Sequence, residues 1–171
     1  MLKYCFSNGC PCDEEESYIQ AAIGGNLDCV RFLFAKVEPS RETEKEVGGQ
    51  AAGKGCIDIL KYLVEERKIS DEVKSQCVYN AAGFGQLDCL KYLLGEEAKA
   101  PLNTWQHVAF ARYHEQPDCV NYLLEKGCPE PTDEEYAWIV EQIEERERLR
   151  LYRERNTWRE TSSDAARERK F

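Results

Sequence analysis

The chain has 171 residues, of which 23 are basic and 32 acidic, so its formal net charge is −9. Hydrophobic residues make up 42%, enough to bury a core, and the longest uncharged run, residues 75–87, is too short to cross a bilayer. The acidic balance argues against nucleic acid as the main partner, because phosphate binding needs a basic face. The first residues do not resemble a secretory signal. We therefore expect an intracellular, cytoplasmic protein with no membrane partner.

Residues 1–9 are predicted to form the second helix of a partial first unit, and Cys10 and Cys12 follow as a C-x-C pair. A structural zinc site needs four ligands, usually as two spaced pairs, and no second pair stands at that spacing. The chain holds nine cysteines in all. We interpret them as reduced thiols, many of them buried as small apolar groups, and predict no metal and no other cofactor.

From Ala21 onward the chain repeats itself every 30 residues. Four segments align, and they begin at residues 21, 51, 81 and 111: AAIGGNLDCVRFLF, AAGKGCIDILKYLV, AAGFGQLDCLKYLL and ARYHEQPDCVNYLL. An aspartate recurs at residues 28, 58, 88 and 118, and a leucine at residues 33, 63, 93 and 123. A helix–turn–helix unit of this length cannot bury its own apolar face. The period therefore indicates units stacked around a shared core.

Each recurrent residue has a physical reason. The paired alanines predict a first helix that approaches its neighbour closely. Gly25, Gly55 and Gly85 are placed to end that helix, because glycine adopts the left-handed conformation without a Cβ penalty. The aspartate that follows is predicted to start the second helix, where it caps free N–H groups and complements the helix dipole. Apolar residues one, two, four and five places after the aspartate form the buried stripe of that second helix.

The fourth repeat is irregular, since Glu115 replaces the glycine and Pro117 replaces a leucine or isoleucine. Proline is tolerated at a helix start, whereas a left-handed glutamate costs about 1–2 kcal/mol unless the turn opens. Two interpretations stay open. The irregularity is sequence drift near the end of the array, or it marks an exposed contact patch of Trp105, Tyr113 and His114, since aromatic residues are enriched in binding hot spots.

The last segment differs in composition from the rest. Residues 132–143 are predicted to begin a fifth first helix that caps the array. Residues 1–143 carry a net charge of −11, whereas residues 144–171, with nine basic and seven acidic groups, carry +2. We therefore predict two parts: a repeat array over residues 1–143, and a charged helical extension and tail over residues 144–171. The tail from Asn156 is predicted to be disordered by itself.

The sequence contains two weak candidates, one for a phosphate-binding loop and one for a catalytic histidine, and both lack a required residue. Residues 48–55 come within one residue of a phosphate-binding loop, but Gly55 replaces the required hydroxyl and SRETEKEV, which precedes it, cannot be a buried strand. His107 and His114 are the chain's two histidines. His114 could serve a cysteine as a base, but the sequence places no cysteine beside it, and acid–base work needs a positioned partner. No catalytic residue is predicted, and we expect no enzyme.

Residues 81–94, A-A-G-F-G-Q-L-D-C-L-K-Y-L-L, resemble the core of an ankyrin repeat, A-A-x-x-G-x-x-x-hydrophobic-hydrophobic-x-x-L-L. The resemblance covers residues 10–140. The period is thirty rather than about thirty-three, and the T-P-L-H opening is missing, so we expect no full β-hairpin finger. The variants L-D-C-L-K-Y-L and G-C-P are similar to divergent ankyrin arrays of large DNA viruses and protists. The implied fold is an all-α, ankyrin-like solenoid of stacked helix–turn–helix repeats with a charged C-terminal helix.

This resemblance implies a non-catalytic scaffold that binds a protein partner through its concave face. In ankyrin arrays the two positions after each alanine pair face that surface, and Phe84 and Tyr113 are favoured because the core does not require large apolar groups there. Burial of these two against the neighbouring repeat is the alternative. The predicted partner-binding residues are Phe84, Tyr113, His114, Trp105, Lys54 and Ile23. A second interpretation is a structural subunit of a larger assembly, such as a viral particle, anchored by residues 144–171.

Overall fold

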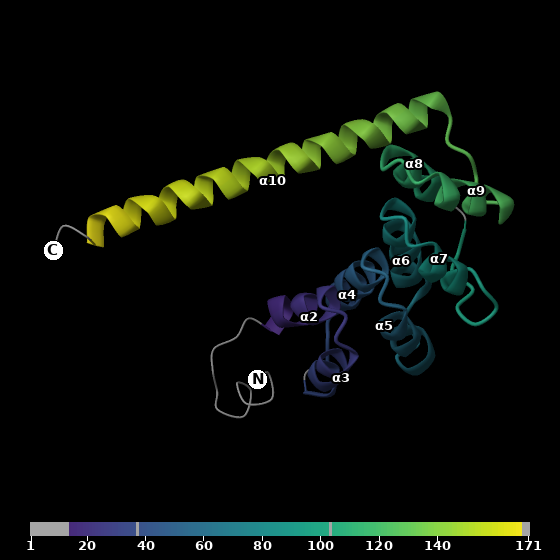
Figure 1. The fold of residues 1–171 in the computed structure, drawn as a ribbon, viewed down its shortest axis with the longest axis horizontal. Coiled ribbons are helices and arrows are strands. Elements are labelled where there is room, and N and C mark those ends of the chain that lie inside the picture. Colours follow the sequence, from purple (N-terminus) through teal and green to yellow (C-terminus); the bar gives the residue numbers. More distant parts are fainter. Residues whose placement is uncertain (1–13, 37, 103, 169–171) are drawn as a thin grey trace. The chain divides into compact units, whose positions relative to one another are not determined.

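The structure is a computed structural model that describes residues 14–36, 38–102 and 104–168 (Figure 1). Within those ranges the regular elements are helices, and there is no strand. In chain order they are α2 (Glu14–Ile23), α3 (Leu27–Lys36), α4 (Arg41–Gly53), α5 (Ile57–Lys61), the π-helix η1 (Tyr62–Glu66), α6 (Asp71–Gly83), α7 (Leu87–Leu93), α8 (Gln106–Tyr113), α9 (Pro117–Glu125) and α10 (Asp133–Glu168). The predicted all-α class is confirmed. The helix predicted over residues 1–9 lies outside the described residues.

The chain divides into two compact units between Pro131 and Thr132. The first unit holds α2 to α9, and the second contains α10. The boundary predicted from composition, between residues 143 and 144, lies inside α10, because this helix is continuous there. α10 also remains helical beyond Asn156, where the sequence alone predicts a disordered tail. The arginine, glutamate and alanine residues of that stretch are good helix formers, which favours its continuation.

In the first unit the helices form two layers (Figure 1). The first helices of the repeats, α2, α4, α6 and α8, pack side by side in that order and form what we call the inner layer. The second helices, α3, α5 with η1, α7 and α9, form the outer layer. α4 and α6 are 13 residues long. No strand is present in the described part of the array, so the described connectors between repeats form no β-hairpin.

The recurrent alanines and leucines form the core, as the repeat predicts. The alanines are buried in the inner layer, and the leucines of the outer layer are buried against them. These residues are Ala21, Ala22, Ala51, Ala52, Ala81, Ala82, Ala111, Leu33, Leu63, Leu93 and Leu123. Burying a leucine side chain contributes roughly 1.5–3 kcal/mol, so the leucine column is a major part of what holds the layers together.

Glycine also permits close packing within the inner layer. A Cβ on Gly48 of α4 would stand 2.8 Å from the Cys77 sulfur of α6, and a Cβ on Gly49 would overlap the amide of Asn80. A glycine inside a helix weakens it by about 1 kcal/mol relative to alanine. The structure shows that they are the condition for the close approach of α4 and α6.

The turn between the two helices of a repeat has the predicted left-handed glycine. Gly25, Gly55 and Gly85 have φ of 64°, 77° and 71°. The amide two residues before each recurrent aspartate donates to the carbonyl of the first alanine of the same repeat, as in Cys56 N to Ala51 O at 2.8 Å. This bond satisfies a carbonyl that the helix end leaves without a partner.

Each glycine turn is also covered by the repeat that follows it. A Cβ on Gly55 would stand 2.7 Å from Gln86 Oε1, and one on Gly85 would overlap the Gln116 side chain. Gln86 Nε2 donates to the Gly53 carbonyl at 3.3 Å, so the covering side chain also bonds to the turn. The glycines are therefore required for two reasons, their φ and the close approach of the next repeat.

Glu115 keeps the same turn without glycine. Its φ is 55°, and the amide of Gln116 donates to the Ala111 carbonyl at 2.9 Å, as in the other repeats. Of the two outcomes that the sequence leaves open, the glutamate adopts the strained conformation and the turn stays closed. Pro117 is the first residue of α9, as predicted.

The aspartates lie in the first turn of the outer helices, but they are not the N-caps. The residues at the N-cap positions of α5, α7 and α9 are Cys56, Gln86 and Gln116, and none makes a side-chain cap. In the first repeat Asn26 Oδ1 accepts a bond from Cys29 N at 3.0 Å. The predicted capping bond of the aspartates is thus corrected, and their contribution is to the helix dipole.

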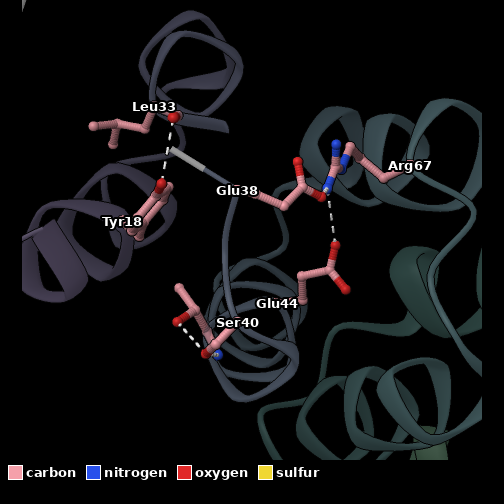
Figure 2. Close-up of polar contacts among 7 residues, drawn as sticks. Tyr18, Leu33, Glu38, Ser40, Glu44 and Arg67 are labelled. Carbon is pink, nitrogen blue, oxygen red and sulfur yellow. Dashed lines mark hydrogen bonds and ion pairs between the residues drawn. The ribbon is translucent and has the colours of Figure 1, made fainter. Parts of the chain in front are cut away.

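Polar contacts join consecutive repeats at the connectors (Figure 2). Arg67, which follows η1, donates from Nη2 to Glu38 Oε1 at 2.6 Å and to Glu44 Oε1 at 3.4 Å. Its guanidinium carbon also lies 5.4 Å from the centre of the Phe34 ring. Because Glu38 and Phe34 precede α4 and Arg67 ends the next repeat, this arginine fixes the spacing of the two.

Candidate protein-binding surface

Five of the six predicted binding residues lie at the same end of the inner helices. Lys54, Phe84 and His114 are the C-cap residues of α4, α6 and α8, and Ile23 and Tyr113 are the last residues of α2 and α8. The positions therefore recur because the repeat places the same helix end at the same point of each unit.

Trp105 lies apart from this group. It immediately precedes α8, whereas Tyr113 is the last residue of that helix, so the helix separates them by about 12 Å. Of the patch that the sequence suggests, Tyr113 and His114 therefore lie at one end of α8 and Trp105 at the other.

The structure brings five rings together, which we call the aromatic cluster: Tyr79, Phe84, Phe110, Tyr113 and His114. His114 is central to it. Its ring centre lies 4.5 Å from that of Phe110, 5.0 Å from Tyr113 and 5.9 Å from Phe84. Tyr79 stacks on Phe110 with ring centres 3.9 Å apart. Three of the predicted residues thus belong to one cluster, which α6 and α8 build together.

Exposure differs sharply within the cluster. Phe110 is buried, and Tyr79, Tyr113 and His114 are half-buried. Phe84 is 55% exposed, and no other large apolar side chain in the described part of the repeat unit is exposed to that degree. The rings of Phe110 and His114 contact Phe84, but more than half of its side chain remains open to solvent.

Glycines of the preceding repeat make room for these rings. A Cβ on Gly83 would overlap the Phe110 ring, and one on Gly53 would stand 2.9 Å from Phe84 Cδ2. The alternative interpretation, burial against the neighbouring repeat, therefore holds for one side of the Phe84 ring but not for the whole side chain.

Equivalent positions along the inner helices form rows across the repeats, and we call this surface the inner-helix face. Residues four apart on each helix belong to successive rows, and residues thirty apart belong to the same row. Four rows cross it: Glu42 and Glu72; Glu16, Glu46, Gln76 and Gln106; Gln20, Gln50, Asn80 and Phe110; and Gly24, Lys54, Phe84 and His114. Carboxylates and amides make up most of these rows, and the aromatic residues Phe84, Phe110 and His114 lie at the C-terminal ends of α6 and α8.

Hydrogen bonds order the polar part of the face. Gln50 Nε2 donates to Glu46 Oε1 at 2.8 Å, and Gln76 Nε2 donates to Asn80 Oδ1 at 3.2 Å. Gln20 and Glu16 repeat the first of these bonds on α2, at 2.7 Å. Since each amide retains further donors and acceptors, the rows present both kinds of group to solvent.

Charge on α4 is uneven. The cations Arg41 and Lys45 both pair with Glu72 of α6, at 2.7 and 3.5 Å. Glu42 and Glu46 are exposed and have no ion pair within the described ranges. Two carboxylates without an ion pair therefore lie in the N-terminal half of α4, and the cation Lys54 lies at its C-terminal end.

His107 is a core residue. It is 1% exposed, its Nε2 lies 3.1 Å from Ser75 Oγ, and it donates to the Ser75 carbonyl at 3.2 Å. Burial lowers its pKa to about 4, an effect that the bond to Ser75 partly opposes. The imidazole is neutral at physiological pH and joins α6 to α8, so it has no role at the surface.

The thiols of the core are poor nucleophiles. Burial raises the pKa of Cys77 to about 12 and that of Cys89 to about 11. A thiol with so high a pKa is protonated at neutral pH, and the thiolate is the reactive form. In the part of the chain that the structure describes, no three potential metal ligands form a group. Cys10 and Cys12 lie outside that part.

Two further sequence features have structural outcomes. The glycine-rich segment that resembles a phosphate-binding loop is helical through Gly53, because it belongs to α4. No helix among the described residues is both long and apolar enough to span a bilayer.

The sequence alone did not point to Phe110, Tyr79 or the amide rows. A signal was present in the column of residues 20, 50, 80 and 110, which reads Gln, Gln, Asn and Phe. It lies one residue before each alanine pair, and in three repeats it is polar while its neighbours are apolar. The column does not reveal the ring contacts of Phe110, because they depend on the space that the missing Cβ of Gly83 leaves for the ring.

Comparisons with known proteins agree with this architecture. A family model described as ankyrin repeats (3 copies) matches residues 49–134, just over half of the chain. A chain in the crystal structure of the yeast ribosomal protein Rps3 in complex with its chaperone Yar1 is similar in fold, with a TM-score of 0.54. That likeness covers 72% of this chain and 100% of the other, at 24% sequence identity. No curated protein sequence matches significantly.

Proposed function

The chain belongs to the ankyrin-repeat family, and from this we propose that it is a non-catalytic module that binds a protein partner through its inner-helix face, the concave face of the array. The partner contacts would be made by the aromatic cluster, with Lys54 and Ile23 beside it. We further propose an intracellular, cytoplasmic location, with protein rather than nucleic acid as the main partner, since the chain carries a net charge of −9.

The exposure of Phe84 is the observation that carries this proposal. A phenylalanine that is 55% exposed leaves apolar surface in water, which costs roughly 25 cal/mol per Å². Here the ring is held in place by His114, Phe110 and the space over Gly53. A positioned aromatic ring loses little conformational entropy on binding, and such rings dominate binding hot spots.

The structure of similar fold supports a protein as the partner, because that structure is a complex of a ribosomal protein and its chaperone. A binding function also agrees with the state of Cys77 and His107, since burial raises the pKa of the thiol and lowers that of the imidazole.

The test is a cross-linking pull-down with the intact chain and a Phe84→Ala/Tyr113→Ala double variant. Phe32→Ala is the matched control, because Phe32 is a half-buried aromatic residue of α3 in the outer layer. We expect the double variant to lose a partner that the wild type and the control both recover. Equal recovery by all three proteins would remove the aromatic cluster as the binding site.

A second candidate function is that of a structural subunit in a larger assembly, such as a viral particle, anchored by residues 144–171. The observation that favours it is a set of exposed apolar side chains on α10: Leu149, Leu151 and Tyr152. If the protein is found only in a large particle and leaves it when residues 144–171 are deleted, this function is supported. A single partner recovered at a defined ratio by both the intact and the shortened chain would contradict it.

A further inference from the structure

We infer that the inner-helix face selects an extended, basic segment of the partner that carries a large aromatic or aliphatic side chain about six residues from its basic part. The inference rests on the proposed function and specifies the chemistry of the partner at the same site.

The basic character follows from the charges on α4. Glu42 and Glu46 are exposed, one helical turn apart, and have no ion pair among the residues that the structure describes. The cations Arg41 and Lys45 of the same helix share Glu72, and Lys54 lies about two turns beyond Glu46, at the C-terminal end of α4. A lysine or arginine of the partner would supply the missing charges, and the net charge of −9 would speed its approach.

The extended conformation follows from the amide rows in the middle of the face. Gln50, Gln76 and Asn80 bond to a neighbour on their own helix and keep other donors and acceptors open. Such groups match the N–H and C=O groups of a peptide backbone. A helical partner has already satisfied those groups internally, whereas an extended segment presents them to the face.

The spacing of six residues follows from the packing of the inner layer. Helices that pack side by side have axes about 8–10 Å apart. Glu42 and Glu46 lie about 16 and 10 Å before Gly53 along α4, and the Phe84 ring lies against Gly53 at the end of the next helix, α6. An extended chain advances about 3.3 Å per residue, so about six residues cover one step across and about 16 Å along the helix.

The apolar end of the segment would lie on Phe84. This ring contacts His114 and Phe110 and lies against Gly53, yet the side chain is 55% exposed. An aromatic or large aliphatic side chain placed there would bury the exposed ring and add an offset or edge-to-face contact. Nucleic acid does not fit the same face, because its phosphates would meet Glu42 and Glu46.

The experiment measures fluorescence anisotropy of labelled synthetic peptides with the intact chain. The first peptide has three alternating lysines followed, six residues later, by tryptophan, with valines and threonines between them, which disfavour a helix and keep the backbone N–H groups. Three relatives change one feature each: tryptophan to serine, lysines to glutamates, or the valines and threonines to alanines, which permits a helix. We expect the first peptide to bind best, and the serine and glutamate forms to bind at least about tenfold more weakly.

The protein variants test which residues are responsible. Glu42→Gln/Glu46→Gln removes two charges with little change in shape. It should weaken binding of the first peptide about threefold or more, while the first peptide should still bind more tightly than its serine form. Glu97→Gln/Glu125→Gln is the matched control, because both residues are exposed and lie away from the inner-helix face. Phe84→Ala should abolish the advantage of tryptophan over serine. Circular dichroism of each variant checks that the array is intact.

Several outcomes would overturn the inference. If Glu42→Gln/Glu46→Gln and Glu97→Gln/Glu125→Gln weaken peptide binding equally, the peptide is attracted to the acidic protein in general and not to α4. If the alanine peptide binds more tightly than the first peptide, a helical partner is favoured. If no peptide binds, yet the Phe84→Ala/Tyr113→Ala variant loses its partner in the pull-down, the proposed function stands and the inference about partner chemistry fails. If the peptides bind as described and that variant loses no partner, the proposed function fails by itself.

Discussion

The ring of Phe84 in α6 lies against Gly53 of α4, so closely that a Cβ at position 53 would stand 2.9 Å from Phe84 Cδ2. The exposed ring of one repeat is thus positioned by a glycine of the repeat before it. The position of the proposed binding residue Phe84 therefore depends on how closely α4 and α6 pack.

Gly53→Ala is expected to move Phe84 without removing it. The new methyl group cannot share the space with the ring, but Phe84 is exposed and can swing away. Alanine also favours the end of α4 by up to about 1 kcal/mol over glycine. We expect unchanged or slightly higher stability in urea denaturation, and weaker partner recovery in the pull-down.

A double variant shows whether the loss acts through Phe84. In a Phe84→Ala background, Gly53→Ala should cause no further loss of binding, because the ring that it displaces is absent. Additive losses would mean that Gly53 affects the partner directly.

Gly83→Ala is expected to lower stability, in contrast to Gly53→Ala. Its Cβ would overlap Phe110, which is 8% exposed and, unlike Phe84, has no free direction in which to move. Overpacking of this kind costs typically about 1–3 kcal/mol. The free energy of unfolding from urea denaturation should fall by that amount, and Phe110→Leu in the same chain should recover part of it. A Gly83→Ala variant as stable as the wild type would contradict the packing described here.

Glu115→Gly is expected to stabilise the protein. Glu115 has a φ of 55° in a turn where the other repeats have glycine, and a left-handed non-glycine residue costs about 1–2 kcal/mol. Part of this gain is offset by the greater freedom of glycine in the unfolded chain, so we expect a net gain near 1 kcal/mol. Thermal unfolding measures it. Glu115→Ala keeps the strain and is the control, and it should give no comparable gain.

The free energy of unfolding is expected to decrease as the pH is lowered, because His107 is buried in its neutral form. Burial lowers its folded pKa to about 4, whereas the unfolded chain has a histidine pKa near 6.5. Between these values the unfolded state binds a proton that the folded state does not. The stability is therefore complete above pH 6.5 and declines as the pH falls toward 4, by roughly 3 kcal/mol at most.

Urea denaturation at several pH values separates this contribution from that of the carboxylates. His107→Gln should flatten the curve between pH 6.5 and 4, since glutamine cannot be protonated there. His114→Gln, which leaves the contact of His107 with Ser75 intact, is the control. An identical slope in all three proteins would exclude His107 as the source.

The sequence predicts the repeat fold well because each recurrent residue has one local reason. Short-range requirements determine three of these features: the alanine pairs, the glycines at residues 25, 55 and 85, and the leucine column. The structure places all three as expected. The capping role of the aspartates was predicted less well, since a shift of one residue moves a side chain from the cap into the first turn.

The surface is predicted only in part. Phe84, Tyr113 and His114 follow from the repeat, and they do come together. The contribution of Phe110 and the separation of Trp105 depend on packing between repeats and on the length of α8, which thirty-residue periodicity does not contain. Their role in partner binding stays a prediction.

The covering of each glycine turn by the following repeat gives the array a direction. Gln86 covers the turn at Gly55, and Gln116 covers the turn at Gly85. In a polypeptide emerging from the ribosome, each of these covering contacts can form only after about thirty more residues have been synthesised.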